Sequence, residues 1–321
     1  MLKHNCTSVF APYILQYIDF KRSVGYKFQC TDYFYLFDRF AVENEIQSAE
    51  LTRDICDIWA EKRPNESPVT RYKRISAVRS LSRFMNALGI SSYVPRLPGN
   101  CRSTFTPHIY SHDEIGKFFT ECDKLTITPG TYTAPLYPAL FRLLYGTGMR
   151  LGEAIALRCK DVNLDDGIIT LRGTKNGEDR LVPISASLCG ILRDYASSYA
   201  EPTPASYFFT QRNRKQLIHA NVYTAFRSLL LKCGIPYRGR ENGPRIHDFR
   251  HTFSVHTLAK MSENGLDLYY SLPILSKYLG HKSLEATDQY VRLTEEMFPD
   301  LLKKTNDVCA YIFPEVDEYE A

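Results

Sequence analysis

Basic, imidazole and carboxylate side chains in the second half of this sequence recur at spacings that suit chemistry on a phosphate. Arg150, in "GTGMRLGEAIAL", precedes Glu153 by one helical turn, and the carboxylate could hold its guanidinium in place. His247 and Arg250, in "HDFRHTF", fall on one helix face at i and i+3. Such a pair can hold one tetrahedral anion, with the arginine bidentate and the histidine as donor or proton carrier.

Further residues could complete such a site. Lys175 directly precedes an Asn-Gly dipeptide that favours a hairpin turn, and it has the reach to protonate a leaving oxygen. His281 follows a glycine at an expected corner between two helices, and Tyr290 lies on the second of these helices. Tyrosine is a poor nucleophile at neutral pH because its pKa is about 10, but cations around a phosphate would stabilise the phenolate.

Each of these residues also has an ordinary structural interpretation when it is taken alone. The arginines and the lysine could be solvated charges, and the corner histidine and the tyrosine could be packing residues. His247 and His251 are spaced i, i+4 as in zinc-protease helices, but Asp248 stands where those helices need Glu. We therefore expect no metal and no other cofactor.

The bulk composition is that of a globular chain. Its 321 residues, 44% hydrophobic and 24% charged, are enough for two domains with separate cores. No apolar run approaches the roughly 18–20 residues of a membrane-spanning helix, and the N-terminus lacks a secretion-signal pattern. The 9 cysteines include no C-x-x-C pair, which disfavours a disulfide framework or a zinc finger. We expect a cytoplasmic protein with no membrane partner.

The first hundred residues predict a helical domain with a basic face. Residues 67–112 contain no Asp or Glu but several Arg and Lys. In the clearest helix of this domain, apolar residues from Ala77 to Leu88 share one stripe, while Arg79 and Arg83 point the other way. Such a face suits a phosphate-rich partner, and a solvated basic helix is the alternative. The candidate nucleic-acid-binding residues are Arg71, Lys73, Arg74, Arg79 and Arg83.

The remaining sequence predicts a mainly helical second domain with one small sheet. Residues 93–107 are basic and rich in proline, as in a linker. Ser111 and Glu114 form a capping-box pattern at the start of the domain. A β-hairpin is expected around the Asn-Gly dipeptide. Helices are expected near 185–200, 219–233, 247–263, 273–279 and 283–291.

Taken together and in order, these motifs resemble the tyrosine recombinase (phage integrase) family over about residues 107–298. The matching segments are "TGMRLGEAIAL", "TKNGEDRLVPI", "HDFRHTF" and "LGH", followed by a tyrosine. The resemblance implies a mainly α fold with a small β-sheet, formed by a helical core-binding (SAM-like) domain and an α+β catalytic domain. It implies domains at 1–92 and 108–298, the linker at 93–107, and a tail at 299–321 that docks on a neighbouring protomer or on its own domain.

The resemblance also assigns roles on a scissile phosphate. Arg150 and Arg250 would grip the phosphate, Glu153 would support the first arginine, and His281 would donate to a non-bridging oxygen.

The same resemblance assigns the proton transfers and the nucleophile. Lys175 would protonate the leaving 5′-oxygen, and His247 would take part in proton transfer. Tyr290 would attack to form a 3′-phosphotyrosine, which requires an accessible hydroxyl.

These features predict a site-specific DNA recombinase of integrase or transposase type that moves a mobile element. The expected partner is double-stranded DNA with paired half-sites, bound by a tetramer, so that the protein associates with the bacterial nucleoid when on DNA. The alternatives that share the motifs are an Xer-like resolving recombinase, a type IB topoisomerase-like DNA relaxer, and a DNA-binding protein without activity.

Overall fold

The structure, a computed structural model, divides the chain into two compact units, Met1–Thr104 and Phe105–Ala321. The residues that it describes are 6–26, 28, 31–99, 106–126, 133–173, 179–198, 203–211, 214–237, 239, 243–281, 287 and 290. Within these residues, no helix is both long enough and apolar enough to cross a bilayer. The narrower domain bounds expected from the sequence stay predictions.

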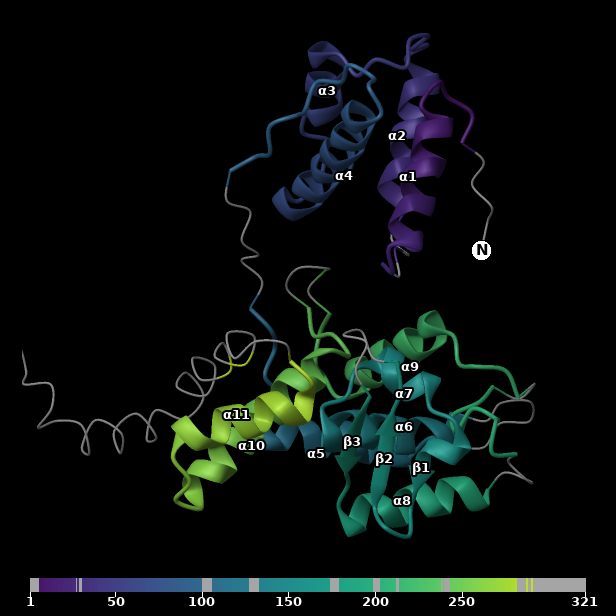
Figure 1. Cartoon of the computed structure of the whole chain (residues 1–321). Helices are drawn as coiled ribbons and strands as arrows, with labels where there is room; N and C mark the ends of the chain where they lie inside the picture. The colour runs from purple at the N-terminus through teal and green to yellow at the C-terminus, as the bar shows by residue number, and fades with distance from the viewer. Residues whose placement is uncertain are drawn as a thin grey trace, which may run out of the picture. The chain divides into compact units, whose positions relative to one another are not determined.

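The first unit is a group of helices (Figure 1). Aromatic side chains make up much of its core. Its helices are α1 (Ala11–Ser23), α2 (Asp32–Glu43), α3 (Arg53–Ala60) and α4 (Pro68–Ala87). Phe37 of α2 and Trp59 of α3 are buried edge to face, with ring centroids 5.2 Å apart. Aromatic side chains bury large apolar areas, so this cluster supplies much of the stability of a small unit.

Helix α4 packs against α1, α2 and α3. Its buried apolar residues are Ile75, Val78, Leu81 and Met85. Leu88 was expected on the buried stripe, but it is 44% exposed. The buried face is therefore rotated from the predicted one, and it includes Arg74, which is 1% exposed.

The second unit is mainly helical with a small sheet, as the sequence predicted (Figure 1). Its helices are α5 (His112–Asp123), α6 (Thr133–Thr147), α7 (Leu151–Ala156), α8 (Ala186–Ser197), α9 (His219–Lys232), α10 (Asp248–Glu263) and α11 (Leu268–Leu279). The 3-10 turn η1 (Cys159–Asp161) leads into strands β1 (Val162–Asn163), β2 (Ile168–Leu171) and β3 (Arg180–Pro183), which form an antiparallel sheet in the order β1-β2-β3.

Helix α6 is central to the core of this unit, where it packs against α5, α7, α8 and α10. Buried phenylalanines from four helices meet there. Phe118 of α5 lies 5.4 Å from Phe141 of α6 and 5.2 Å from Phe249 of α10, measured between ring centroids. Because Phe249 adjoins Arg250, this packing fixes the N-terminal turn of α10 against α6.

Helix α11 differs at its start from the expected helix 273–279. Asp267 accepts the backbone N–H of Tyr269, so the helix begins at Leu268, and Pro273 lies inside it. The helix ends as predicted at Gly280, whose φ of 69° is the left-handed conformation that glycine adopts without steric cost.

Two other predicted features have different outcomes. The capping box of Ser111 and Glu114 is present at the start of α5. The helix expected at 283–291 lies outside the described residues, apart from Thr287 and Tyr290, which are helical.

The register of β2 and β3 sets which side chains of β3 face the protein. Leu171 pairs with Arg180, and Ile169 pairs with Val182. Val182 is 1% exposed, whereas Leu181 is 63% exposed. Since side chains alternate along a strand, Arg180 shares the covered face with Val182.

Candidate active site

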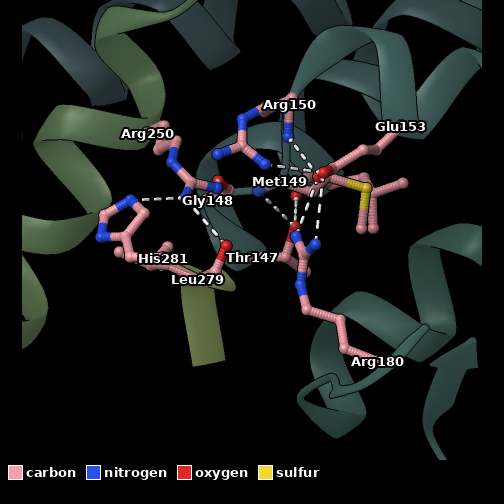
Figure 2. Close-up of polar contacts among 10 residues, drawn as sticks. Thr147, Gly148, Met149, Arg150, Glu153, Arg180, Arg250, Leu279 and His281 are labelled. Atoms are coloured by element: carbon pink, nitrogen blue, oxygen red, sulfur yellow. Dashed lines mark hydrogen bonds and ion pairs between the residues drawn. The ribbon is translucent and has the colours of Figure 1, made fainter. Parts of the chain in front are cut away.

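Arg150 occupies the N-cap of α7, directly after the turn that ends α6. Its Nη1 donates to Oε1 of Glu153 at 2.9 Å, and its backbone N–H donates to Oε2 at 3.0 Å (Figure 2). Gly148 forms the turn with a φ of 60°. The guanidinium is thus held in one place while its side chain stays 26% exposed.

Arg250 of α10 is buried, at 2% exposed, beneath the same turn. Its Nη1 donates to the carbonyl oxygen of Gly148 at 2.8 Å, and its Nη2 donates to that of Leu279 at 2.9 Å (Figure 2). Burial, followed by the positive charge of Arg150, lowers the pKa of Arg250 to about 10, so it remains charged at neutral pH. One guanidinium therefore ties the start of α7 to the end of α11.

His281 bonds to Arg250 through one nitrogen and to a hydroxyl through the other. Nη2 of Arg250 lies 2.8 Å from Nε2, and Nδ1 lies 2.7 Å from Oγ1 of Thr287. A guanidinium can only donate, so Nε2 must accept and Nδ1 carries the proton. Burial, followed by the charge of Arg250, lowers the pKa of His281 to about 4, which agrees with a neutral ring.

Tyr290 lies beside these residues but is covered. It is 1% exposed, in an apolar cluster with Val255 of α10 and Leu279 of α11. Its ring centroid lies 6.1 Å from that of His281 and 5.5 Å from that of His251. The expectation of an accessible phenol is therefore wrong for this form of the protein, because packing on α10 and α11 buries the side chain.

His247 and His251 line the first turns of α10. Their rings lie at right angles, with centroids 5.0 Å apart. His247 keeps an exposed surface, but protein surrounds much of its ring, and this desolvation, followed by the charge of Arg250, lowers its pKa to about 4. Burial, followed by the charge of His247, lowers the pKa of His251 to about 3. Within the described residues, no cluster of three or more His, Cys, Asp or Glu side chains forms a metal-ligand set.

The structure thus brings several predicted site residues together and leaves one unplaced. The residues that it gathers around the turn at Gly148 are Arg150, Glu153, Arg250 and His281, with Tyr290 and His247 adjacent. Lys175 lies outside the described residues. The roles of these side chains remain predictions.

Sequence reasoning missed Arg180, which completes this polar cluster (Figure 2). Its Nη2 lies 2.8 Å from Oε2 of Glu153, and its Nη1 lies 3.2 Å from Oε1. The alternation of β3 could have placed Arg180 on the covered face, but its partner on α7 depends on tertiary packing.

Arg74 was predicted to bind nucleic acid, and its position contradicts this. Its Nε and Nη2 contact the two carboxylate oxygens of Glu66 at 2.8 and 2.9 Å. The same guanidinium donates to the carbonyls of Trp59 and Glu61. A cation that is 1% exposed and bonded on every side joins α3 to α4 and has no surface to offer a partner.

The other basic candidates of the first unit differ in exposure. Lys73 and Arg83 are exposed. Arg71 and Arg79 are half-buried, and they donate to the carbonyls of Ala60 at 2.8 Å and Pro95 at 2.6 Å. Binding of nucleic acid by these four residues stays a prediction.

Known proteins resemble this chain in sequence over much of its length. A family model described as the phage integrase family matches residues 110–297. The integrase/recombinase y4rB of Sinorhizobium fredii is 30% identical over 312 residues, which cover 92% of this chain and 97% of that protein. The tyrosine recombinase XerA of Pyrococcus furiosus is 32% identical over 166 residues, 51% of this chain and 52% of that protein.

Solved structures resemble this chain in fold. A lambda integrase dimer bound to a COC' core site aligns with a TM-score of 0.64 at 16% identity, covering 87% of this chain and 94% of that chain. The recombinase XerH bound to its difH substrate aligns with a TM-score of 0.61 at 19% identity, covering 89% and 83%. At these identities the likeness shows the fold, a mainly helical protein with a small antiparallel sheet.

Proposed function

Because this chain belongs to the phage integrase family of tyrosine recombinases, we propose that it is a site-specific DNA recombinase that cuts and rejoins strands through a phosphotyrosyl bond. The observation that carries the proposal is the convergence of Arg150, Arg250 and His281 on the turn at Gly148, with Tyr290 packed beside them. Two guanidiniums can stabilise the charge that gathers on a phosphate under attack, and each such donor is worth on the order of 10²-fold or more in rate.

The reaction needs one bond exchange and two proton movements. The oxygen of Tyr290 bonds to phosphorus, and the bond from phosphorus to the 5′-oxygen breaks. His247 is neutral at pH 7, because burial and the charge of Arg250 lower its pKa to about 4. The negative charge of a bound phosphate would raise that pKa towards the range in which an imidazole accepts the proton that the phenol loses. Lys175 donates a proton to the leaving 5′-oxygen. The phosphodiester energy is kept in the phosphotyrosyl bond, so a second 5′-hydroxyl can reverse the step on another strand.

Cleavage requires a rearrangement of the site seen in this structure. Tyr290 is 1% exposed. Nη2 of Arg250 donates both of its N–H groups, one to the carbonyl of Leu279 and one to His281. A phosphate that accepts from Nη2 of Arg250 therefore has to replace one of these acceptors, and we propose that it replaces His281. Nε2 of His281 then needs a proton before it can donate to a phosphate oxygen, so DNA binding and protonation of this ring are coupled.

The proposed partner is duplex DNA with paired half-sites, bound by a tetramer, with the helical unit and the catalytic unit both on the DNA. We place the domains at 1–92 and 108–298, as expected from the sequence. Integration or transposition is favoured over dimer resolution because the relative y4rB, named as an integrase/recombinase, matches 92% of this chain. The match of XerA over 51% of the chain keeps an Xer-like resolving role as the second candidate.

Covalent capture tests the nucleophile. The Tyr290→Phe variant, which should bind DNA without cutting it, would be used to select a cognate duplex from a randomised pool. A nicked form of that duplex would then trap the covalent complex between the enzyme and the cleaved strand. We expect covalent adducts with the wild type and with Tyr269→Phe, a matched control in which the altered side chain is 79% exposed on α11. Adducts that persist with Tyr290→Phe would remove Tyr290 from this role, and relaxation of supercoiled DNA without strand exchange would favour the topoisomerase-like alternative.

A leaving-group test addresses Lys175. Sulfur leaves as a thiolate without needing a proton, since thiols are far more acidic than alcohols. A 5′-bridging phosphorothiolate should therefore restore cleavage by Lys175→Ala but not by Arg150→Ala. Equal rescue of both variants, or of neither, would show that Lys175 is not the proton donor.

A further inference from the structure

Arg180 is the first residue of β3, and its guanidinium lies against Glu153 (Figure 2). It contacts Glu153 with both terminal nitrogens, at 2.8 and 3.2 Å, and its side chain is only 12% exposed. A bidentate pair of this kind fixes orientation as well as position. Arg180 therefore holds the carboxylate from the side opposite to Arg150.

Each carboxylate oxygen of Glu153 accepts two hydrogen bonds from the two arginines. Oε1 receives Nη1 of Arg150 at 2.9 Å and Nη1 of Arg180 at 3.2 Å. Oε2 receives the backbone N–H of Arg150 at 3.0 Å and Nη2 of Arg180 at 2.8 Å. With one carboxylate between two guanidiniums, the group keeps a net positive charge. If Arg180 were absent, Glu153 would neutralise Arg150, and the cation offered to a phosphate would be weaker.

The same side chain also touches the turn that carries His281. A Cβ added to Gly280 would lie 3.1 Å from Cδ and 3.1 Å from Nη1 of Arg180, so the arginine lies directly against this glycine. Gly280 separates His281 from Leu279, whose carbonyl accepts from Arg250. Arg180 thus lies against both protein segments that present the proposed phosphate-binding groups, and it does so from the start of β3.

We propose that Arg180 is a positioning residue that offsets the charge of Glu153, keeps Arg150 aligned through that carboxylate, and holds the start of β3 against the turn at Gly280. This inference rests on the proposed function. We assign Arg180 no catalytic role, because both of its terminal nitrogens are engaged by Glu153 and it acts on the phosphate through Arg150.

The test measures single-turnover cleavage of the selected nicked duplex. Arg180→Met should lower the rate on the order of 10²-fold, as expected when a reacting group is misplaced by about 1 Å. The matched control is Arg193→Met on α8, because Arg193 is 51% exposed and pairs with Asp165, which is 98% exposed. An exposed pair contributes little, so the control should stay within about 3-fold of the wild type.

A second background shows whether Arg180 acts through Glu153. In a Glu153→Gln variant there is no carboxylate charge for Arg180 to offset. Adding Arg180→Met to this variant should therefore lower the cleavage rate by less than about 3-fold. A smaller loss than in the wild-type background is the coupling expected between directly interacting residues. Equal losses in both backgrounds would overturn the proposal and indicate that Arg180 touches DNA itself. Wild-type cleavage of the same duplex is measured in parallel. If the proposed function is wrong, the wild type itself forms no Tyr290 adduct, and this outcome differs from a wrong role for Arg180, in which the wild type still cleaves.

The pH dependence of the cleavage rate gives a second readout. It should not change if Arg180 only supports the fold. Burial would raise the pKa of Glu153, but the hydrogen bonds from Arg180 and Arg150 hold it below its usual value. The other charged or titratable groups that face it are His247 and Arg250. Arg180→Met should therefore raise the pKa of Glu153. Its cleavage defect relative to the wild type should shrink as the pH is lowered, because a protonated Glu153 no longer offsets the charge of Arg150. An unchanged profile would contradict the proposal.

Arg180→Lys carries the test if the methionine variant does not fold. Lysine keeps the charge but cannot make the bidentate contact. We expect roughly a 10-fold loss that shrinks in the Glu153→Gln chain. Full activity of Arg180→Lys would show that charge alone is needed and would overturn the positioning role.

Discussion

Gly148→Ala is the substitution for which the structure predicts the most definite loss. A Cβ at this position would lie 2.5 Å from Cδ1 of Phe253 and 3.1 Å from Cδ2 of Leu279. The φ of 60° costs an L-residue about 1–2 kcal/mol. The overlap with packed side chains costs a further 1–3 kcal/mol or so. We therefore expect the second unit to lose roughly 2–5 kcal/mol, a large part of the ~5–15 kcal/mol that stabilises a typical domain.

The same substitution should impair cleavage more than the stability loss alone would. The carbonyl of Gly148 accepts from Nη1 of Arg250, so a shift of this turn moves the buried guanidinium relative to Arg150. A displacement of about 1 Å at a reacting centre costs on the order of 10²-fold in rate. The loss should appear in single-turnover cleavage at a temperature where the variant is still folded.

Urea unfolding measures the stability loss separately in each unit. The single tryptophan, Trp59, lies in the core of the first unit, so its emission follows that unit. Gly148→Ala should shift the far-UV circular dichroism transition of the second unit and leave the Trp59 transition in place. Gly152→Ala is the matched control, since its Cβ would find only His219 at 3.9 Å and helix α7 would gain up to about 1 kcal/mol. Gly148→Ala with wild-type stability and wild-type cleavage would refute this reasoning.

Three further predictions concern the first unit and the response to pH. Arg74→Met should destabilise the first unit by about 3–5 kcal/mol, because it leaves the buried carboxylate of Glu66 unpaired, and urea unfolding followed by Trp59 emission measures this. Arg83→Ala should leave that stability unchanged but lower the slope of log K against log salt for DNA binding by about one; an equal slope would place Arg83 off the DNA. His251 has a pKa of about 3 when folded and 6.5 ordinarily, so the unfolded chain takes up its proton first and stability falls as pH drops from 6.5 towards 3. We expect a loss of about 3 kcal/mol from this residue by about pH 4 and a flatter Tm profile for His251→Gln; equal profiles would contradict the assignment.

The sequence predicted the family, the fold class and the residues that meet at the turn, because these depend on local motifs and on their order along the chain. It failed where a tertiary partner decides the outcome. In the sequence, Arg74 is one of several cations on a basic helix, but in the structure it is buried because it pairs with Glu66. Arg180 escaped notice because Glu153 lies 27 residues before it in the chain.

The burial of Tyr290 has the same kind of cause. Its spacing from "LGH" indicates a helix position, but whether the side chain faces solvent depends on how α10 and α11 pack. The early start of α11 was missed because an aspartate cap outweighed the first-turn preference of Pro273.

Peptide mapping of the covalent complex in EDTA shows whether fixed cations of this chain activate one phenol on one phosphate. After the wild type is mixed with the nicked duplex in excess chelator, we expect the DNA to remain attached by a 3′-phosphate to the peptide that contains Tyr290. Attachment elsewhere, or strand cutting that stops in chelator and returns with magnesium, would contradict this mechanism.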